Sequence, residues 1–181
     1  METGVANHTV ALKDALPLIG VLLGGILSIA GGLLSNLFIE CRRAKSARRN
    51  LALAFAGEIS AIVEIVNTRQ YIPNLRNAIT YMEETGEIYP LHISVNRDYF
   101  NVYVSNVSNI GILGGRLPRM IATFYTQGNS VLEDINSLSN DALGESDVSF
   151  HIEAYKELLK LFESTIVVGH KIVCEIEKTY S

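Results

Sequence analysis

The sequence predicts an all-α protein, with one N-terminal transmembrane helix followed by a cytosolic antiparallel bundle of about four helices. Three observations predict this class: a long uncharged stretch near the N-terminus, a basic cluster directly after it, and apolar residues at helical spacing in most of the remainder. Of the 181 residues, 48% are hydrophobic and 19% are charged, and the mean hydropathy is +0.23. Such a chain is too apolar to be disordered.

Charge divides the chain into four expected regions. Residues 1–14 form a short extracytoplasmic N-terminus, and residues 15–39 form the transmembrane helix. Residues 40–50 form a basic juxtamembrane stalk that leads into an acidic helical cytosolic domain over residues 51–181. From residue 50 onward nine Lys and Arg stand against sixteen Asp and Glu, a net charge of −7, whereas the whole chain carries −4.

The uncharged stretch from Ala15 to Ile39 predicts the membrane span. Its 25 residues form a helix about 37 Å long at roughly 1.5 Å per residue. About 20 residues suffice to cross a hydrocarbon core of about 30 Å. A buried helix of a soluble protein rarely runs this long without a charged side chain, so we expect this helix to cross a bilayer with some tilt.

Basic residues follow the uncharged stretch, and only Lys13 precedes it. A signal peptide has the reverse order, with its positive charges first. Lys and Arg near a span remain in the cytoplasm, so we expect the N-terminus outside and the remainder inside. The same side chains should contact lipid headgroups. They are Arg42, Arg43, Lys45, Arg48 and Arg49.

Small residues recur at every fourth position of the span, at Gly20, Gly24, Ser28, Gly32 and Asn36. This spacing puts them on one helix face, where a second backbone can approach closely and gain dispersion contacts. Because a single span has no second span of its own, we expect a homo-oligomer that associates through this face. Asn36 could add a hydrogen bond across it.

Apolar residues at spacings of three and four predict four helices in the cytosolic domain. These helices cover residues 51–66, 74–85, 118–138 and 148–179. The first can continue directly from the span, and Glu58 and Glu64 fall off its apolar stripe. Gly86 ends the second helix, and Cys174 is expected in the core of the last. Helices of these lengths suit an antiparallel bundle.

Residues 88–115 interrupt the helical pattern, and two structures remain open for them. Apolar and polar residues alternate from Leu91, and aromatic and β-branched residues continue to Val104. A short β-hairpin turning at Arg97 and Asp98 is one interpretation. An irregular loop packed against the bundle is the other. The many Asn, Ser and Gly residues after position 100 disfavour a regular helix.

The chain shows no constellation typical of catalysis, metal binding or a cofactor. The four histidines include no pair at metal-ligand spacing, and no nucleophile elbow is present. Adjacent acids such as Glu83 and Glu84 diverge on a helix and cannot share a proton. Cys41 and Cys174 form no disulfide framework. We therefore expect no catalytic residue, no metal site and no cofactor.

Aromatic and polar residues between positions 99 and 125 form the candidate contact for a ligand or partner. Aromatic walls with a few polar groups are typical of ligand pockets, although packing inside the bundle is the alternative. The aromatic residues are Tyr99, Phe100, Tyr103 and Tyr125, with Asn106, Asn109 and Arg116 nearby. Gly111, Gly114 and Gly115 precede a helix but lack the ending of a P-loop. The candidate contact residues are Tyr99, Tyr103, Asn106, Gly114 and Arg116.

Several segments after the span and the basic stalk share their order and spacing with a known group of proteins. They are Leu51–Ala61, Tyr99–Tyr103, Asn106–Leu113 and the helix containing Phe124 and Tyr125. In these segments the chain resembles an uncharacterised family of small single-span bacterial inner-membrane proteins with a helical cytosolic domain. The resemblance covers roughly residues 15–138 and implies a bacterial inner-membrane setting. That family has no assigned activity, so no catalytic or binding residue carries over.

These observations favour a membrane-anchored, self-associating, non-enzymatic interaction or sensory module of the inner membrane. Its expected partners are membrane lipid, a second copy of the chain and a further protein. The negative net charge and the lack of aromatics among the basic residues disfavour nucleic acid. One alternative is a pore-forming or membrane-disrupting effector, although a pore needs a polar face and the span offers only Ser28, Ser35 and Asn36. A small membrane-tethered enzyme is a further, disfavoured alternative.

Overall fold

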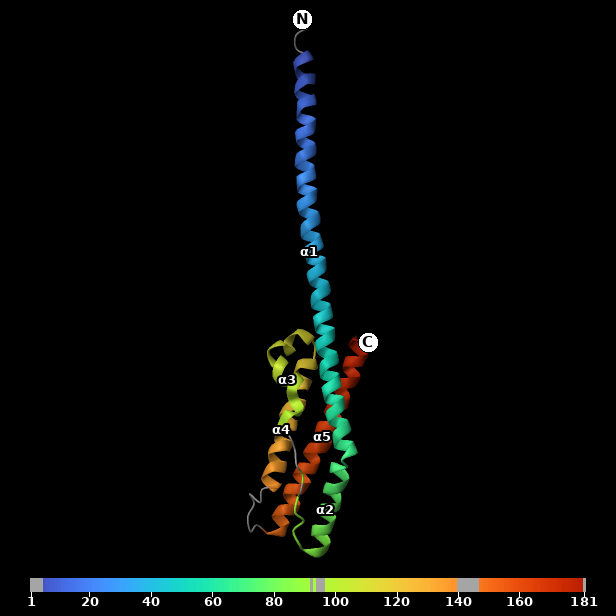
Figure 1. The fold of residues 1–181 in the computed structure, drawn as a ribbon, viewed down its shortest axis with the longest axis vertical. Helices are drawn as coiled ribbons and strands as arrows, with labels where there is room; N and C mark the ends of the chain where they lie inside the picture. The colour runs from blue at the N-terminus through green and yellow to red at the C-terminus, as the bar shows by residue number, and fades with distance from the viewer. Residues whose placement is uncertain (1–4, 92, 94–96, 140–146, 181) are drawn as a thin grey trace. The chain divides into compact units, whose positions relative to one another are not determined.

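The computed structural model describes residues 5–91, 93, 97–139 and 147–180, with the backbone alone for residues 5–23, 26, 27, 29, 30, 97 and 98. Every regular element in these residues is helical and none is a strand, which confirms the all-α class. The elements, with η for a 3-10 helix, are α1 (Val5–Thr68), α2 (Tyr71–Thr85), η1 (Arg97–Phe100), α3 (Asn101–Asn106), η2 (Val107–Leu113), α4 (Leu117–Ser139) and α5 (Val148–Tyr180) (Figure 1).

The four long helices α1, α2, α4 and α5 lie close to the ranges that the sequence predicts. α1 runs without interruption through the predicted span, the stalk and the first helix of the domain. α2 begins three residues earlier than expected, with Pro73 in its first turn, where the missing N–H is not needed. Gly86 ends α2 at φ +70°, and its N–H donates to the carbonyl oxygen of Met82 at 3.0 Å.

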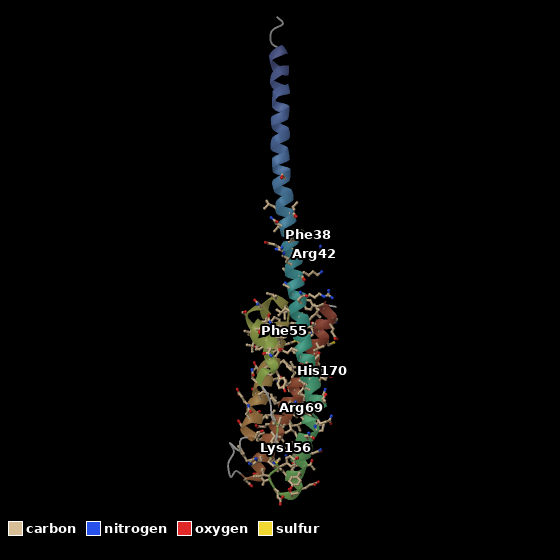
Figure 2. All side chains as sticks on the ribbon, viewed as in Figure 1. Phe38, Arg42, Phe55, Arg69, Lys156 and His170 are labelled. Carbon is tan, nitrogen blue, oxygen red and sulfur yellow. The ribbon has the colours of Figure 1, made fainter. Side chains whose placement is uncertain are left out.

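The chain divides into two compact units, which we call the N-terminal unit (Met1–Ala47) and the helical unit (Arg48–Ser181). In the N-terminal unit, large apolar side chains on α1 are between 43% and 68% exposed. They are Leu33, Leu34, Leu37, Phe38 and Ile39. The basic residues that follow are also exposed, and Figure 2 labels Phe38 and Arg42 on α1.

One described helical segment near the N-terminus is long and apolar enough to cross a membrane. It lies within Gly31–Thr85, and 22% of its most apolar 18-residue window is buried. Core helices of soluble proteins and signal sequences share this length and composition, but core helices are mostly buried. The structure therefore has one helix near the N-terminus that is long and apolar enough to span, as expected, and the predicted bounds 15–39 overlap this segment only from residue 31 onward.

The core of the helical unit consists of two apolar clusters. The first joins α1, α4 and α5, and its fully buried residues include Phe55, Ile59, Ile121, Phe124 and Ile172. The second joins α2, α4 and α5, and includes Leu75, Met82, Ile135, Tyr155 and Leu158. α5 packs against both α2 and α4 (Figure 1). Burial of each large apolar side chain contributes about 1.5–3 kcal/mol.

Gly169 allows α1, α4 and α5 to approach one another closely. A Cβ atom at this position would lie 2.9 Å from Cε2 of Phe124 and 3.2 Å from Cγ2 of Ile59. Both distances are shorter than normal van der Waals contact. The absent side chain is therefore what lets these two core residues reach the backbone of α5.

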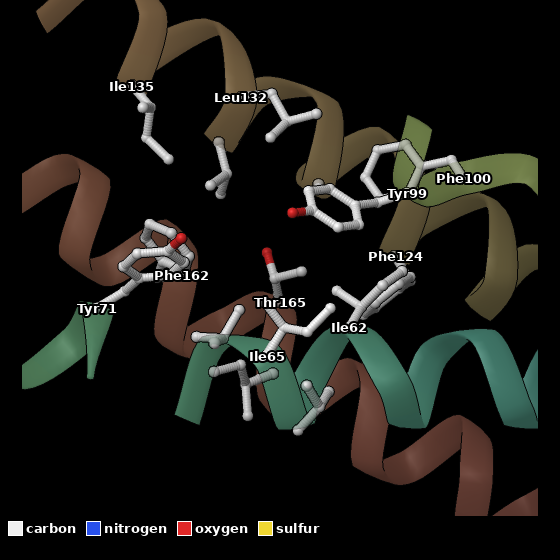
Figure 3. Close-up of a pocket in the computed structure, with 15 residues that line it drawn as sticks. Ile62, Ile65, Tyr71, Tyr99, Phe100, Phe124, Leu132, Ile135, Phe162 and Thr165 are labelled. Carbon is white, nitrogen blue, oxygen red and sulfur yellow. The ribbon is translucent and has the colours of Figure 1, made fainter. Parts of the chain in front are cut away.

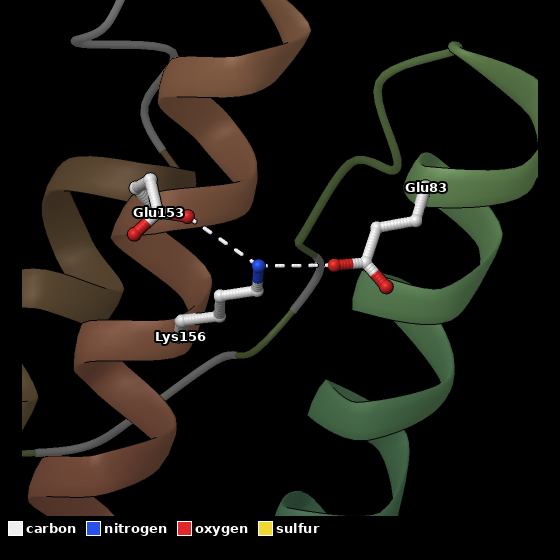
Figure 4. A network of polar contacts seen from close by, with 3 residues as sticks. All are labelled: Glu83, Glu153 and Lys156. Atoms are coloured by element: carbon white, nitrogen blue, oxygen red, sulfur yellow. Dashed lines mark hydrogen bonds and ion pairs between the residues drawn. The ribbon is translucent and has the colours of Figure 1, made fainter.

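Polar contacts at the surface connect α2 with α5. The Nζ atom of Lys156 lies 3.0 Å from Oε1 of Glu83 on α2 and 3.4 Å from Oε1 of Glu153 one turn earlier on α5 (Figure 4). Arg76 on α2 also pairs with Glu163 on α5. All five side chains are well exposed, so each pair contributes at most about 1 kcal/mol.

The β-hairpin that the sequence allowed between Leu91 and Val104 is wrong for the described residues. His92 and residues 94–96 lie outside the described part, and from Arg97 the chain is helical. In this segment the inward residues follow helical spacing, because Tyr99, Val102, Tyr103 and Asn106 are partly buried while Val104 is 71% exposed. The aromatic and β-branched residues therefore belong to a short amphipathic helix rather than a strand.

Cys174 is exposed, which corrects its expected place in the core. The buried face of α5 is formed here by Gly169, Ile172 and Ile176. Residue 174 lies two positions from both isoleucines, about 200° around the helix, and so points away from that face.

Candidate functional site

A partly open apolar pocket of about 70 Å³ lies within the helical unit. Its walls come from α1, η1, α4 and α5, with one residue from α2 (Figure 3). The labelled lining residues are Ile62, Ile65, Tyr71, Tyr99, Phe100, Phe124, Leu132, Ile135, Phe162 and Thr165. The cavity could hold more than one water by volume, but a cavity lined by hydrocarbon has too few polar partners to hold water well.

Hydroxyl groups are the polar atoms of the pocket wall. The side chains of Tyr99 and Thr165 turn their oxygen atoms toward the cavity (Figure 3). Thr165 Oγ1 also donates to the carbonyl oxygen of Leu161 at 2.7 Å. The hydroxyl of Tyr71 accepts a hydrogen bond from Nη1 of Arg69 at 3.1 Å. A molecule in this pocket would meet hydrocarbon on most sides, together with the hydroxyl groups of Tyr99 and Thr165.

Gly128 determines how Phe100 closes one wall of the pocket. A Cβ atom at position 128 would lie 2.8 Å from Cζ of Phe100. The ring of Phe100 therefore rests directly on the backbone of α4, where a larger residue would displace it. Glycine is a weak point inside the helix predicted over residues 118–138, yet α4 continues through Gly128 without a break.

Glu58 is a partly buried carboxylate beside this pocket. Its Oε1 accepts the backbone N–H of Val102 at 2.6 Å, and its Oε2 accepts the N–H of Tyr103 at 3.2 Å. Oε2 also accepts a short hydrogen bond from the hydroxyl of Tyr125. The two N–H groups lie in the first turn of α3, where helical N–H groups have no partner within the helix. Glu58 of α1 thus caps α3, and its negative charge interacts favourably with the positive N-terminal end of the α3 dipole.

Tyr125 lies at the centre of an aromatic cluster. Its ring stacks on Tyr103 with centroids 4.2 Å apart, and it meets Phe100 edge to face at 5.2 Å. Phe55 and Phe124 complete the cluster. Burial, and then the hydrogen bond to Glu58, raises the pKa of the Tyr125 hydroxyl far above its usual value. Tyr125 therefore remains a hydrogen-bond donor at physiological pH.

The five predicted contact residues do not form one site. Tyr99 lines the pocket, whereas Tyr103 stacks on Tyr125 outside its lining. Asn106 Nδ2 donates to the carbonyl oxygen of Val102 at 2.8 Å. Gly114 is exposed at φ +70°, and Arg116 pairs with Glu175 at 2.7 Å. Of the five, one residue thus lies in the pocket wall and one in the aromatic cluster beside it.

Glu58 is the polar residue that sequence reasoning missed. From the sequence alone it is placed, with Glu64, off the apolar stripe of its helix. The signal that could have found it is spacing, since Glu58 lies three residues after Phe55 and four before Ile62, both of which face the core. A charge at a core-facing position predicts a buried partner.

The small residues of the predicted span and the basic residues that follow it are exposed where the structure describes their surroundings. Gly24 and Gly32 have nothing within 4 Å of a Cβ position, and Ser28 and Asn36 are exposed. The surroundings of Gly20 lie outside the described part. The basic residues Arg42, Arg43, Lys45, Arg48 and Arg49 are exposed, and Arg49 Nε donates to the carbonyl oxygen of Tyr180 at 2.9 Å.

Among the described residues, no three His, Cys, Asp or Glu side chains come together in a way that could hold a metal ion. His151 is 5% exposed and lies in the first turn of α5, and its Nε2 has no hydrogen-bond partner in the described part.

Comparison of the chain with protein-family models, with curated proteins and with solved structures finds no match.

Proposed function

We propose that this protein is a single-span membrane anchor for a helical interaction or sensory domain without enzymatic activity. The observation that carries the proposal is the exposed apolar segment of α1 from Leu33 to Ile39, followed directly by the basic residues from Arg42 to Arg49. Large apolar side chains exposed together mark a surface that meets lipid or a partner. Hydrocarbon followed by basic residues is the order found at the cytoplasmic end of a membrane span.

The orientation follows from the same residues. Basic side chains near a span resist transfer across the membrane, so the N-terminus lies outside and the helical unit lies in the cytoplasm. We propose the bacterial inner membrane as the setting, in line with the resemblance described above. The anionic cytoplasmic leaflet attracts the basic segment. In this setting the helices of the helical unit form an antiparallel bundle.

Self-association through the span is the second part of the proposal. Gly24, Ser28 and Gly32 are exposed on one face of α1, where a second copy of the helix can pack closely. Dimers or larger oligomers would bring several helical units together at one membrane site. A receptor or scaffold gains avidity from such an arrangement without any new contact.

The geometry of the pocket supports a binding role. Its walls are hydrocarbon with a few hydroxyl groups, and both oxygens of the neighbouring Glu58 carboxylate already accept hydrogen bonds. A carboxylate that is fully bonded to its own chain is poorly placed to move a substrate proton. The pocket therefore suits recognition of an apolar group better than chemistry on it.

Membrane fractionation tests the anchor. The full chain should sediment with membranes and resist extraction at alkaline pH. Leu34→Glu combined with Leu37→Glu should shift it toward the soluble fraction, because a carboxylate inside the hydrocarbon core is costly. Leu53→Glu is the matched control, since Leu53 is a 42% exposed leucine on α1 within the helical unit. A wild-type chain found in the soluble fraction, or equal loss in all variants, would contradict the proposal.

A further inference from the structure

Hydrogen bonds bring three segments of the helical unit together at one end. Arg49 Nε, at the start of this unit, donates to the carbonyl oxygen of Tyr180 at 2.9 Å. The hydroxyl of Tyr180 donates to the carbonyl oxygen of Leu113 at 2.8 Å. The first residues of the unit on α1, the end of η2 and the end of α5 therefore meet at what we call the proximal end (Figure 1).

The proximal end is cationic although the helical unit as a whole is acidic. The exposed basic residues on these three segments, and on the turn and first helical turn of α4 that follow η2, are Arg48, Arg49, Arg116, Arg119 and Lys178. On the same segments the acids are Glu175 and Glu177, and Glu175 already pairs with Arg116. Fourteen of the sixteen Asp and Glu after residue 50 lie elsewhere in the chain. The unit therefore has a positive end and a negative remainder.

Exposed apolar side chains lie on η2, which ends at the proximal end, and on α3, which directly precedes η2. On η2, Val107 is 51% exposed and Ile112 is 42% exposed, and on α3 Val104 is 71% exposed. Leu113, next to Ile112, is buried and its carbonyl oxygen holds Tyr180 in place. Exposed apolar residues among cations are typical of surfaces that lie in the headgroup layer of a membrane.

The length of the chain limits how far this end can lie from a bilayer that contains the span. Residues 40–47 separate Ile39 from Arg48, and they are helical. From Ile39 to Arg48 the helix rises by nine residues, which is about 13.5 Å. The headgroup layer is about 5–8 Å thick on each side. Arg48 can therefore lie at most about 6–9 Å beyond the headgroups, a distance similar to the Debye length of about 8 Å at physiological salt.

We propose that the proximal end is a contact surface for anionic phospholipid, with Val107 and Ile112 at the headgroup boundary and Arg116 and Arg119 among the phosphates. The inference rests on the proposed membrane anchor and goes beyond it, because an anchor alone leaves the domain free to reorient on its stalk. Anionic phospholipid attracts the positive end of the helical unit and repels its acidic remainder. These two forces together hold the helical unit in one orientation. The surface would thus present the acidic remainder to the cytoplasm and to any protein partner there.

Lipid quenching of a fluorescent label tests this surface in the full-length chain. Cys41→Ser and Cys174→Ser remove the native thiols, and Val107→Cys or Ser137→Cys introduces one thiol for the label. Ser137 is exposed in the last turn of α4 and serves as the control position. Each protein is reconstituted in vesicles of phosphatidylcholine, with or without phosphatidylglycerol, that carry a quencher in the headgroup layer. In anionic vesicles we expect severalfold stronger quenching at position 107 than at position 137.

Two further comparisons sharpen the outcome. High salt or removal of phosphatidylglycerol should reduce the quenching at position 107 toward that at position 137. Arg119→Glu should reduce it as well, whereas Lys160→Glu, an exposed lysine far from the proximal end in sequence, should not. Equal quenching at both positions, or quenching at 107 that ignores lipid charge, would overturn the contact surface while leaving the anchor intact. A chain that does not float with the vesicles would overturn the anchor and the surface together.

Discussion

The carboxylate of Glu58 on α1 accepts a hydrogen bond from the hydroxyl of Tyr125 on α4, and this pair connects two helices that are distant in sequence. The same carboxylate caps α3 through the N–H groups of Val102 and Tyr103. α3 follows directly after η1, which supplies Tyr99 and Phe100 to the pocket wall. Glu58 therefore holds the wall of the pocket in place from outside the pocket.

Replacing Glu58 by alanine should destabilise the helical unit. The change leaves a buried tyrosine hydroxyl and two N–H groups without their acceptor, which costs about 2–4 kcal/mol. Thermal unfolding of the detergent-solubilised protein, followed by near-ultraviolet circular dichroism, measures the loss. Glu64→Ala is the matched control because Glu64 is exposed on the same helix. Equal small effects of both changes would show that the cap contributes little.

Gly128→Ala should disturb the pocket by displacing the ring of Phe100. The new methyl group would lie 2.8 Å from Cζ of that ring, and such overpacking costs about 1–3 kcal/mol. Gly57→Ala provides the control, since position 57 is helical with nothing within 4 Å and alanine there should add about 0.5–1 kcal/mol. The midpoint temperature of thermal unfolding should therefore fall for Gly128→Ala and rise for Gly57→Ala. A fall for both variants would argue against the steric explanation.

The stability of the protein should decrease at alkaline pH through Tyr155. Burial raises the pKa of Tyr155 to about 12, and its hydroxyl donates to the carbonyl oxygen of Tyr89 at 2.6 Å. The unfolded chain releases this proton near pH 10 while the folded chain retains it, so the contribution is complete below about pH 10 and is lost as the pH rises toward 12.

Tyr155→Phe separates this effect from the titration of other groups. The variant should be less stable by about 1 kcal/mol at neutral pH because the Tyr89 carbonyl loses its partner. It should also show a shallower decline in the melting temperature above about pH 10. Parallel melting curves of wild type and variant across that range would contradict the assignment to Tyr155.

Gly24→Ile combined with Gly32→Ile should weaken self-association of the span. The branched side chains prevent close approach of two helix backbones at the small-residue face. Crosslinking in membranes, or oligomer size in mild detergent, measures the change. Gly25→Ile tests the same substitution one position off that face. Oligomers that survive the double change would place the association in the helical unit instead.

The long helices were predictable because each depends on a local pattern that is repeated several times. The apolar positions of α4 and α5 recur at three and four over many turns, and Gly86 supplies a local end to α2. The start of α5 at Val148 needed no information from elsewhere in the chain. Such repetition outweighs a single misleading residue, as the passage of α4 through Gly128 shows.

The segment from Arg97 to Leu113 was not predictable in this way because its conformation depends on a distant residue. α3 has six residues, which is too short for a helix that is stable alone, and the cap that supports it comes from Glu58, more than 40 positions earlier. Local propensity favoured a strand or a loop. The pocket shares this origin, since its lining residues are brought together from several elements only after folding.

The account depends most on the claim that the chain crosses a membrane once, with its helical unit in the cytoplasm. Labelling of intact cells with a membrane-impermeant maleimide tests this directly, in a chain carrying Cys41→Ser and Ala6→Cys. Cys174 is exposed on the helical unit and serves as the second reporter. We predict labelling at position 6 in intact cells and labelling at Cys174 only after lysis. Labelling of Cys174 in intact cells, or protection of both positions, would contradict the account.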